Sequence, residues 1–187
     1  LVYRRLHLKL SLIIEEISGD VIDLGCGEMP YRKLFLQKAA CYTGVDWGST
    51  PHDLKADIVS DLNEKLPIAD ETYDVAVSIS VMEHLFDHRL FMEEAYRILK
   101  PGGVFYLQVP WQWQIHEQPF DYFRYTPFAL ERLAREAGFT EVKLEPLGTF
   151  FDTIALKINY FIRRYIRGPK MVRLLAMMVA WSICQLT

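Results

Sequence analysis

Apolar and polar residues repeat along this chain with two different periods, which predict helices and strands in alternation. Residues 3–17 carry apolar side chains at helical spacing and predict an amphipathic helix that ends at Gly19. Downstream, short apolar runs predict strands, and the stretches between them predict helices. The predicted strands are 21–24, 41–46, 56–61, 73–80, 103–110 and 141–147, and the later predicted helices are 31–39, 87–99 and one from Pro127 to Gly138.

The order and spacing of these segments predict the fold class. The run 73–80 is apolar on both faces, as a central strand of a parallel sheet is. Strand, helix and strand follow one another at the length that parallel crossovers need, and Thr126 and Pro127 suit a helix N-cap and first helical position. We therefore predict an α/β fold with a doubly wound, mostly parallel sheet and helices on both of its faces.

Length, charge and cysteine content narrow the class of protein. The 187 residues are half hydrophobic, which is enough for one sizeable core. Six basic side chains and no acidic one follow Asp152, whereas residues 1–152 carry nine more acidic than basic side chains. An acidic body is unsuited to nucleic acid, because phosphate contacts need clustered Lys and Arg. The three cysteines lie far apart, which predicts a reducing, cytoplasmic location and no bound metal.

The stretch VIDLGCGEMPY, residues 21–31, ends a predicted strand in an acid and a glycine turn. In a doubly wound sheet this first turn approaches the ligand most closely, and Gly25 and Gly27 let the backbone pass near a bound molecule. A dinucleotide turn needs a third glycine where this chain has Pro30, and a pyrophosphate is repelled by the carboxylate of Asp23. That carboxylate favours a cofactor with positive charge, such as S-adenosylmethionine.

Five segments, in this order and spacing, resemble one family. They are VIDLGCG, YTGVD, the DL of VSDLNEKLP, SISVMEHL and ILKPGGVFYLQVP. Together they resemble the class I S-adenosylmethionine-dependent methyltransferases, specifically the small-molecule group called type 11. The resemblance covers about residues 21–147 and implies a Rossmann-like fold that uses S-adenosylmethionine. Family members usually finish with a seventh, antiparallel strand, and we expect this chain to stop before that strand.

The resemblance also implies which residues bind the cofactor. The glycine turn is expected around its methionine part, Asp46 on both ribose hydroxyls, and Asp61 on the adenine. Taken singly, these acids also have ordinary structural explanations: Asp23 as a turn cap, Asp46 as a solvated loop acid and Asp61 as an N-cap. The predicted cofactor-binding residues are Asp23, Gly25, Cys26, Gly27, Asp46, Trp47, Asp61, Leu62, Ser80 and Val81.

The segment WQWQIHEQPFDYFRYTP, residues 111–127, is the candidate substrate loop because it gathers aromatic and ionisable side chains after a predicted strand. His116 is the first candidate for a general base, since histidine titrates near neutrality, and Asp121 either replaces it or orients it. The alternative is a salt-bridged lid over the cofactor. His84 is a further candidate, with packing beside the following helix as its alternative. The predicted substrate residues are Trp111, Tyr122, Arg124, Tyr125 and His84.

Residues 149–187 form an apolar and basic tail, which we separate from a methyltransferase domain at 1–148. We predict two helices broken at Gly168 and Pro169. The apolar run 174–184 is too short to cross a membrane, which needs ~20 residues. Three roles compete for the tail: a substrate lid, a homodimer contact, or an anchor on an anionic membrane surface.

The sequence thus predicts an S-adenosylmethionine-dependent methyltransferase that modifies a small-molecule or lipid- or glycan-linked acceptor at oxygen. The glycan or lipid link follows from the segment HE…DYxRYT, which resembles a subgroup connected with cell-surface pathways. We expect no nucleic-acid partner, a cytoplasmic location with contact to a membrane surface through the tail, and a homodimer as one arrangement. A non-catalytic cofactor-binding module and a nicotinamide-dependent dehydrogenase are the alternatives, and Pro30 and Asp23 disfavour the second.

Overall fold

The computed structural model describes residues 2–48 and 55–165. Beyond residue 165 it describes residues 171–172, 174–175, 178 and 182. These residues fall into two compact units, one of Ile13–Leu144 and a smaller one of Leu1–Leu12 with Glu145–Thr187. The helix break predicted at Gly168 and Pro169 lies outside the described residues. The division at residue 148 stays a prediction.

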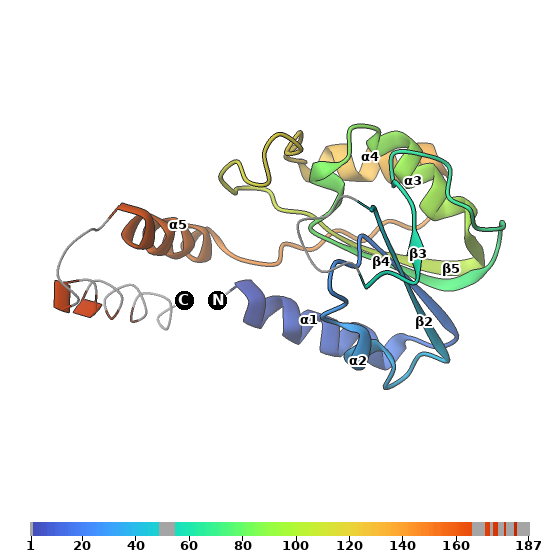
Figure 1. Cartoon of the computed structure of the whole chain (residues 1–187), viewed down its shortest axis with the longest axis horizontal. Helices are drawn as coiled ribbons and strands as arrows, with labels where there is room; N and C mark the ends of the chain where they lie inside the picture. Colours follow the sequence, from blue (N-terminus) through green and yellow to red (C-terminus); the bar gives the residue numbers. More distant parts are fainter. Residues whose placement is uncertain are drawn as a thin grey trace. The chain divides into compact units, whose positions relative to one another are not determined.

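The larger unit is built on a five-stranded parallel sheet with the strand order β3-β2-β1-β4-β5 (Figure 1). The chain enters at β1, moves outward to β2 and β3, and then crosses to the other side of β1 for β4 and β5. This reversal is the doubly wound topology that the sequence predicts, and it creates a switch point between β1 and β4. The strands are β1 (Asp20–Leu24), β2 (Cys41–Asp46), β3 (Ile58–Val59), β4 (Tyr73–Ile79) and β5 (Leu99–Gln108).

Helices cover both faces of the sheet, as predicted (Figure 1). On one face α3 packs beside α4, and the other face carries α2 and the end of α1. The predicted caps form: Thr126 Oγ1 accepts from Ala129 N at 3.3 Å, and Gly138 ends α4 in a left-handed conformation with φ of 117°. The helices are α1 (Val2–Glu16), α2 (Arg32–Phe35), the 3-10 helix η1 (Met82–His84), α3 (His88–Arg97), α4 (Pro127–Ala137) and α5 (Phe150–Tyr165).

The main core lies between the sheet and the layer of α3 and α4. Ile22 and Ala76 on the central strands are fully buried, as is Ala95 on α3. Phe91 of α3 meets Phe105 of β5 edge to face, with ring centroids 6.0 Å apart. Close packing of this kind holds the strand ends, and therefore the residues that follow them, in fixed positions.

Several predicted elements differ from the structure. The predicted helix 31–39 is reduced to α2, the predicted strand 56–61 is reduced to β3, and β5 begins at Leu99 rather than at residue 103. Residues 141–147 are not a strand: Val142 packs on the core, but Leu144 is exposed and the segment pairs with no strand among the described residues. Alternating polarity is a local property, whereas a strand needs a neighbour for its backbone N–H and C=O groups. The third helix ends at Arg97 rather than Leu99, because Leu99 already pairs with Tyr73 at the start of β5.

The smaller unit joins the start of α1 to α5 through ion pairs. Arg5 contacts the buried carboxylate of Asp152 at 3.0 Å, and Lys9 forms a second pair with Glu145. Several apolar side chains along α5 remain exposed, namely Phe150, Phe151, Ile154, Ile158 and Phe161. Within the described part of the chain, no helix has both the length and the apolar character to cross a membrane.

Candidate active site

The turn after β1 is attached to the ends of its two neighbouring strands. Gly25 N and Cys26 N both donate to the carbonyl oxygen of Val45 on β2, at 2.8 and 3.0 Å. Gly25 has φ of 86°, and a Cβ there would lie 2.3 Å from a methyl group of Val81, which follows β4. Only glycine permits this close approach of the two turns at the switch point.

Asp46 at the end of β2 holds the next part of the turn. Its Oδ2 accepts from Gly27 N at 2.6 Å, and its Oδ1 accepts from Trp47 N at 2.8 Å. Gly27 also has a positive φ of 51°, but a Cβ there would find no other atom within 4 Å. The backbone of Gly27 therefore borders open space, where a ligand has room to approach.

Asp23 is a buried acid beside this turn. Its side chain is 3% exposed, and the hydroxyl of Tyr42 donates to its Oδ2. Burial raises the pKa of Asp23 from 3.8 to about 7; the hydrogen bond from Tyr42 lowers it, and the charge of Asp46 raises it. A cation bound near Asp23 would favour the ionised carboxylate.

The other predicted cofactor residues follow β3 and β4 at the same edge of the sheet. Asp61 Oδ1 accepts from the backbone and side-chain nitrogens of Asn63 at 2.8 and 2.9 Å, and Leu62 is buried in the core. Ser80 has φ of 55° and is joined to Gln108 of β5, with its N and Oγ each bonded within 2.9 Å. Because parallel strands end at one edge, this set surrounds one region.

The loop 111–125 contains a linked set of charged side chains. Asp121 is 1% exposed at its side chain and accepts from both terminal nitrogens of Arg124, at 2.6 and 2.8 Å. Its Oδ2 also lies 2.9 Å from His116 N and 3.1 Å from His116 Nδ1. Hydrogen bonding to Arg124 holds the pKa of Asp121 well below its usual range. Asp121 thus stays ionised and orients the ring of His116.

Backbone bonds and an aromatic contact attach this loop to the cofactor end of the sheet. The carbonyl oxygen of Glu83, in η1 after β4, accepts from Tyr122 N at 2.9 Å and from Phe123 N at 3.2 Å. The rings of Phe120 and Trp47 meet edge to face, with centroids 5.2 Å apart. His116 and Asp121 therefore belong to the same end of the larger unit as Asp46.

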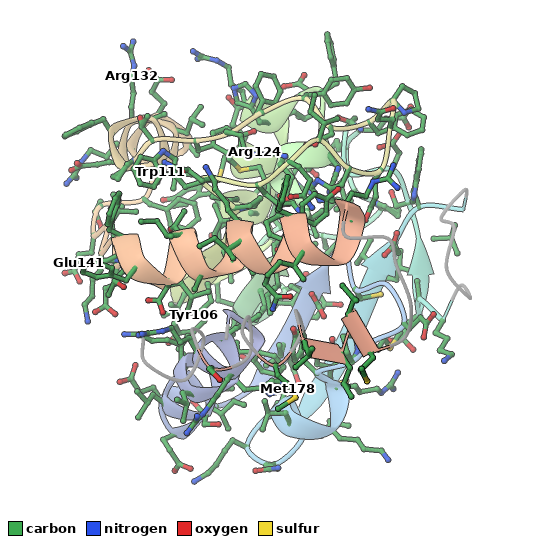
Figure 2. The ribbon with its side chains drawn as sticks, turned by 90° about the vertical axis from the view of Figure 1, so that its left-hand side faces the viewer. Tyr106, Trp111, Arg124, Arg132, Glu141 and Met178 are labelled. Atoms are coloured by element: carbon green, nitrogen blue, oxygen red, sulfur yellow. The ribbon has the colours of Figure 1, made fainter. Side chains whose placement is uncertain are left out.

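The remaining substrate candidates occupy different environments. Trp111 and Tyr122 are 62% and 43% exposed, while Arg124 is held by Asp121 (Trp111 and Arg124 are labelled in Figure 2). Tyr125 is buried, and its hydroxyl donates to the carbonyl oxygen of Met82 at 3.1 Å. His84 lies beside His116, with ring centroids 4.7 Å apart. Only the exposed members of this set are available to a substrate without rearrangement.

Residues 22–107 match the family model of a methyltransferase domain, Methyltransf_11. This part of the chain is a type 11 methyltransferase domain. The match begins in β1 and ends in β5, so it includes residues of all five strands and every predicted cofactor residue. The loop 111–125 and α5 lie beyond the matched part of the methyltransferase domain.

Known proteins similar to the methyltransferase domain include enzymes of this class. A relative from Mycolicibacterium smegmatis, assigned as an S-adenosylmethionine-dependent methyltransferase, is 33% identical over 115 residues, which are 58% of this chain and 45% of the relative. A ubiquinone biosynthesis O-methyltransferase from Pseudomonas entomophila is 30% identical over 113 residues, 51% of this chain and 47% of that protein. The chain thus spans about half the length of the curated relatives it matches.

A solved structure shows the same fold. The S-adenosylmethionine-dependent methyltransferase from Mesorhizobium loti superposes with a TM-score of 0.59, covering 73% of this chain and 82% of that chain. Its sequence identity is 17%, so this likeness concerns the fold alone. It agrees with the Rossmann-like architecture expected for the methyltransferase domain.

Two residues of the methyltransferase domain lie at the candidate site without having been selected from the sequence. The hydroxyl of Tyr42 donates a hydrogen bond to Asp23, but the sequence around Tyr42 indicates only an aromatic core residue on a strand. Glu83 is fully buried, and neither of its carboxylate oxygens has a hydrogen bond among the described residues. The sequence offers a single hint of it, the pair Glu83 and His84 in the segment MEHL.

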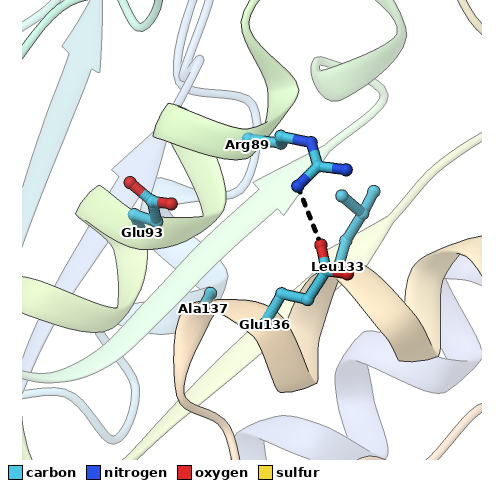
Figure 3. Close-up of a pocket in the computed structure, with 5 residues that line it drawn as sticks. All are labelled: Arg89, Glu93, Leu133, Glu136 and Ala137. Atoms are coloured by element: carbon cyan, nitrogen blue, oxygen red, sulfur yellow. Dashed lines mark hydrogen bonds and ion pairs between the residues drawn. The ribbon is translucent and has the colours of Figure 1, made fainter.

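A small hollow between α3 and α4 is separate from these strand ends (Figure 3). An ion pair between Arg89 and Glu136, 2.9 Å long, spans it beside Leu133. Its free volume of about 10 Å³ has room for roughly one water molecule, so it is no cofactor site of the methyltransferase domain.

Proposed function

We propose that the protein is an S-adenosylmethionine-dependent methyltransferase that transfers a methyl group to the oxygen of a small-molecule acceptor. The observation that carries the proposal is the bond between Gly27 N and Asp46 Oδ2, which holds the glycine turn against the acid that ends β2. Together with the open space at Gly27, this arrangement suits an adenosine cofactor at the switch point.

Local charge supports S-adenosylmethionine over a dinucleotide. The carboxylate of Asp46 holds the turn and raises the cost of an anion there. Burial favours the protonated form of Asp23, and a cation beside it would favour its ionised form, whereas an anion would not. A sulfonium cofactor carries positive charge, whereas the pyrophosphate of a nicotinamide dinucleotide is negative. Pro30 also stands where a dinucleotide turn has its third glycine. We therefore assign Asp23, the turn and Asp46 to the cofactor.

Methyl transfer needs few protein groups. The bond between sulfur and the methyl carbon breaks, its electron pair stays on sulfur to give S-adenosylhomocysteine, and a new bond forms from the methyl carbon to the acceptor. Alignment of donor and acceptor supplies up to about 7–11 kcal/mol of the barrier. A hydroxyl acceptor must also lose its proton. We assign the Nε2 lone pair of His116, directed by Asp121, to the acceptor side of this reaction.

The identity of the acceptor follows from weaker support. The relative from Pseudomonas entomophila is an O-methyltransferase, and the His116–Asp121 pair suits the handling of a hydroxyl proton. Exposed apolar side chains in the loop 111–125 suit a lipid- or glycan-linked acceptor. We propose that class of acceptor, and a lid, dimer or membrane-surface role for the tail remains part of the proposal.

Calorimetric titration with S-adenosylhomocysteine tests the cofactor assignment. We expect the wild-type chain to bind it and Asp46→Ala to lose at least about tenfold in affinity, since one 1.4 kcal/mol interaction is a factor of ten. The matched control is Asp70→Ala, because Asp70 precedes β4 and so lies at the opposite edge of the sheet. Equal affinity of Asp46→Ala and wild type, or no binding by the folded wild type, would contradict the proposal.

Product formation separates an enzyme from a binding module. With lipid-linked sugars and free sugar or phenol hydroxyls as acceptors, we expect His116→Ala to reduce turnover by ~10²-fold or more while S-adenosylhomocysteine affinity changes little. Unchanged turnover in His116→Ala would remove His116 from the reaction. Cofactor binding without turnover on any hydroxyl acceptor would favour the non-catalytic module.

A further inference from the structure

Three side chains that can bind a metal ion converge beside the candidate site. Glu83 and His84 lie in η1 after β4, and His116 lies in the loop after β5. One potential ligand atom from each lies within 4.8 Å of the others. The two imidazole rings meet edge to face at 71°, with their centroids 4.7 Å apart. The fold thus brings together residues that are 32 positions apart in the chain.

Glu83 lacks the partners that a buried carboxyl group needs. Its side chain is 0% exposed, and neither Oε1 nor Oε2 accepts a hydrogen bond within the part of the chain that the structure describes. A buried polar group without a partner is costly, and burial accordingly raises the pKa of Glu83 to about 7. Its Oε1 lies 3.7 Å from His84 Nε2. A cation between these two atoms would supply the missing partner.

Both histidines are oriented with Nε2 as the available nitrogen. His84 Nδ1 lies 2.8 Å from the carbonyl oxygen of Phe120, and His116 Nδ1 lies 3.1 Å from the carboxylate of Asp121. These oxygens can only accept hydrogen bonds, so each Nδ1 carries a proton, and in the neutral ring each Nε2 has a lone pair. An outer hydrogen bond from the second ring nitrogen is typical of histidines that bind metals.

We propose that Glu83, His84 and His116 bind one divalent transition-metal ion, such as Zn²⁺. Two imidazole nitrogens and one carboxylate form a donor set that suits zinc or iron, whereas Mg²⁺ and Ca²⁺ prefer oxygen donors alone. Metal–ligand bonds of about 2.1 Å place tetrahedral ligand atoms roughly 3.4 Å apart. Binding of an ion would draw the ligand atoms, which lie up to 4.8 Å apart, toward that separation.

Three protein ligands leave a coordination position for a water molecule or for the acceptor. In that position the ion lowers the pKa of a bound hydroxyl group, as zinc lowers that of water to about 7. The hydroxyl proton then leaves to solvent, and His116 holds the ion rather than the proton. This role of the ion rests on the proposed function, whereas binding of the ion does not.

The metal alone tests the site. Purified, metal-stripped full chain is titrated with Co²⁺, read by its visible absorption, and the bound ion is then displaced with Zn²⁺. We expect one equivalent to bind to the wild type and to be lost in Glu83→Gln, His84→Ala and His116→Ala. Asp121→Ala should keep the three ligands but weaken binding by about 10–100-fold, because it removes the outer hydrogen-bond partner of His116. The matched control is His7→Ala on α1, which should bind Co²⁺ as the wild type does.

Titration of each variant with S-adenosylhomocysteine provides the second measurement. A variant that retains this ligand is folded, so loss of Co²⁺ binding alone supports the metal site. A wild type that binds S-adenosylhomocysteine but no Co²⁺ overturns the metal site and leaves the proposed function intact. Co²⁺ bound equally by wild type and the His84→Ala, His116→Ala double variant also overturns it. Co²⁺ binding without S-adenosylhomocysteine binding supports the metal site while contradicting the proposed function.

Discussion

The substitution Asp23→Asn tests whether burial controls the charge beside the glycine turn. Asn has nearly the same shape, and its carbonyl oxygen can still accept from the Tyr42 hydroxyl. Burial raises the pKa of Asp23 from 3.8 to about 7. A pKa difference of roughly 3 corresponds to about 4 kcal/mol of preference for the neutral form in the folded chain.

The direction in which Asp23 changes the free energy of unfolding with pH depends on whether the folded or the unfolded chain holds the proton. An unfolded aspartate ionises above about pH 4, whereas buried Asp23 keeps its proton up to about pH 7, so unfolding releases a proton in that range. The stabilising contribution is complete below the unfolded pKa and is lost as the pH rises to about 7. From about pH 5 to about pH 8, Asp23 therefore lowers the free energy of unfolding by about 3 kcal/mol, and Asn contributes no such change.

Urea unfolding followed by circular dichroism measures this difference. The free energy of unfolding of Asp23→Asn minus that of the wild type should increase by about 3 kcal/mol between about pH 5 and about pH 8. Glu83, which burial also affects, is present in both proteins and cancels in the difference. Asp20→Asn, a partly exposed aspartate at the other end of β1, is the control. A difference that stays constant within about 1 kcal/mol would show that burial does not raise the pKa of Asp23.

Two further predictions concern the turn and the core. Gly27→Ala should lower the free energy of unfolding by about 1–2 kcal/mol, because Gly27 has a positive φ, and should abolish S-adenosylhomocysteine binding. Gly25→Ala should be more destabilising, because its added Cβ would overlap the side chain of Val81. Equal melting temperatures of the two variants would contradict this prediction. Arg97→Ala should lower the free energy of unfolding by about 3–5 kcal/mol, because buried Glu94 loses its hydrogen bonds of 2.7 and 2.6 Å from Arg97. The control is Arg89→Ala, which breaks an exposed ion pair and should cost less than about 1 kcal/mol. An equally small loss for Arg97→Ala would contradict the prediction.

Much of the fold was predictable from local patterns. Apolar runs located the five strands, and the capping residues Thr126 and Gly138 located α4. Motifs selected the glycine turn, Asp46 and Asp61 as candidates because each lies at or just beyond the end of a strand. Parallel strands end at one edge of a sheet, so their position in the chain was enough to bring them together. The metal-free expectation and the assignment of His116 as a base rested on residue types alone.

The structure added the contacts between segments that are distant in the chain. The segment 141–147 has the alternation of a strand but pairs with none, since backbone pairing requires a partner strand as well as a pattern. The convergence of His116 with Glu83 and His84 likewise joins loops that follow different strands, and it has no signature in spacing. The contacts of Asp121 with His116 and Arg124 are local, 5 and 3 positions apart, and agree with the orienting role and the ion pair that the loop sequence suggested.

Periodicity and motifs are properties of neighbouring residues. They were therefore enough to predict the order of the strands along the chain, the glycine turn after β1 and the family that residues 22–107 match. The burial of Asp23 and Glu83, and the convergence of Glu83, His84 and His116, depend instead on the tertiary structure. Desolvation and the convergence of ligand atoms depend on packing between β4, β5 and the loops that follow them, and packing is a property of the whole fold.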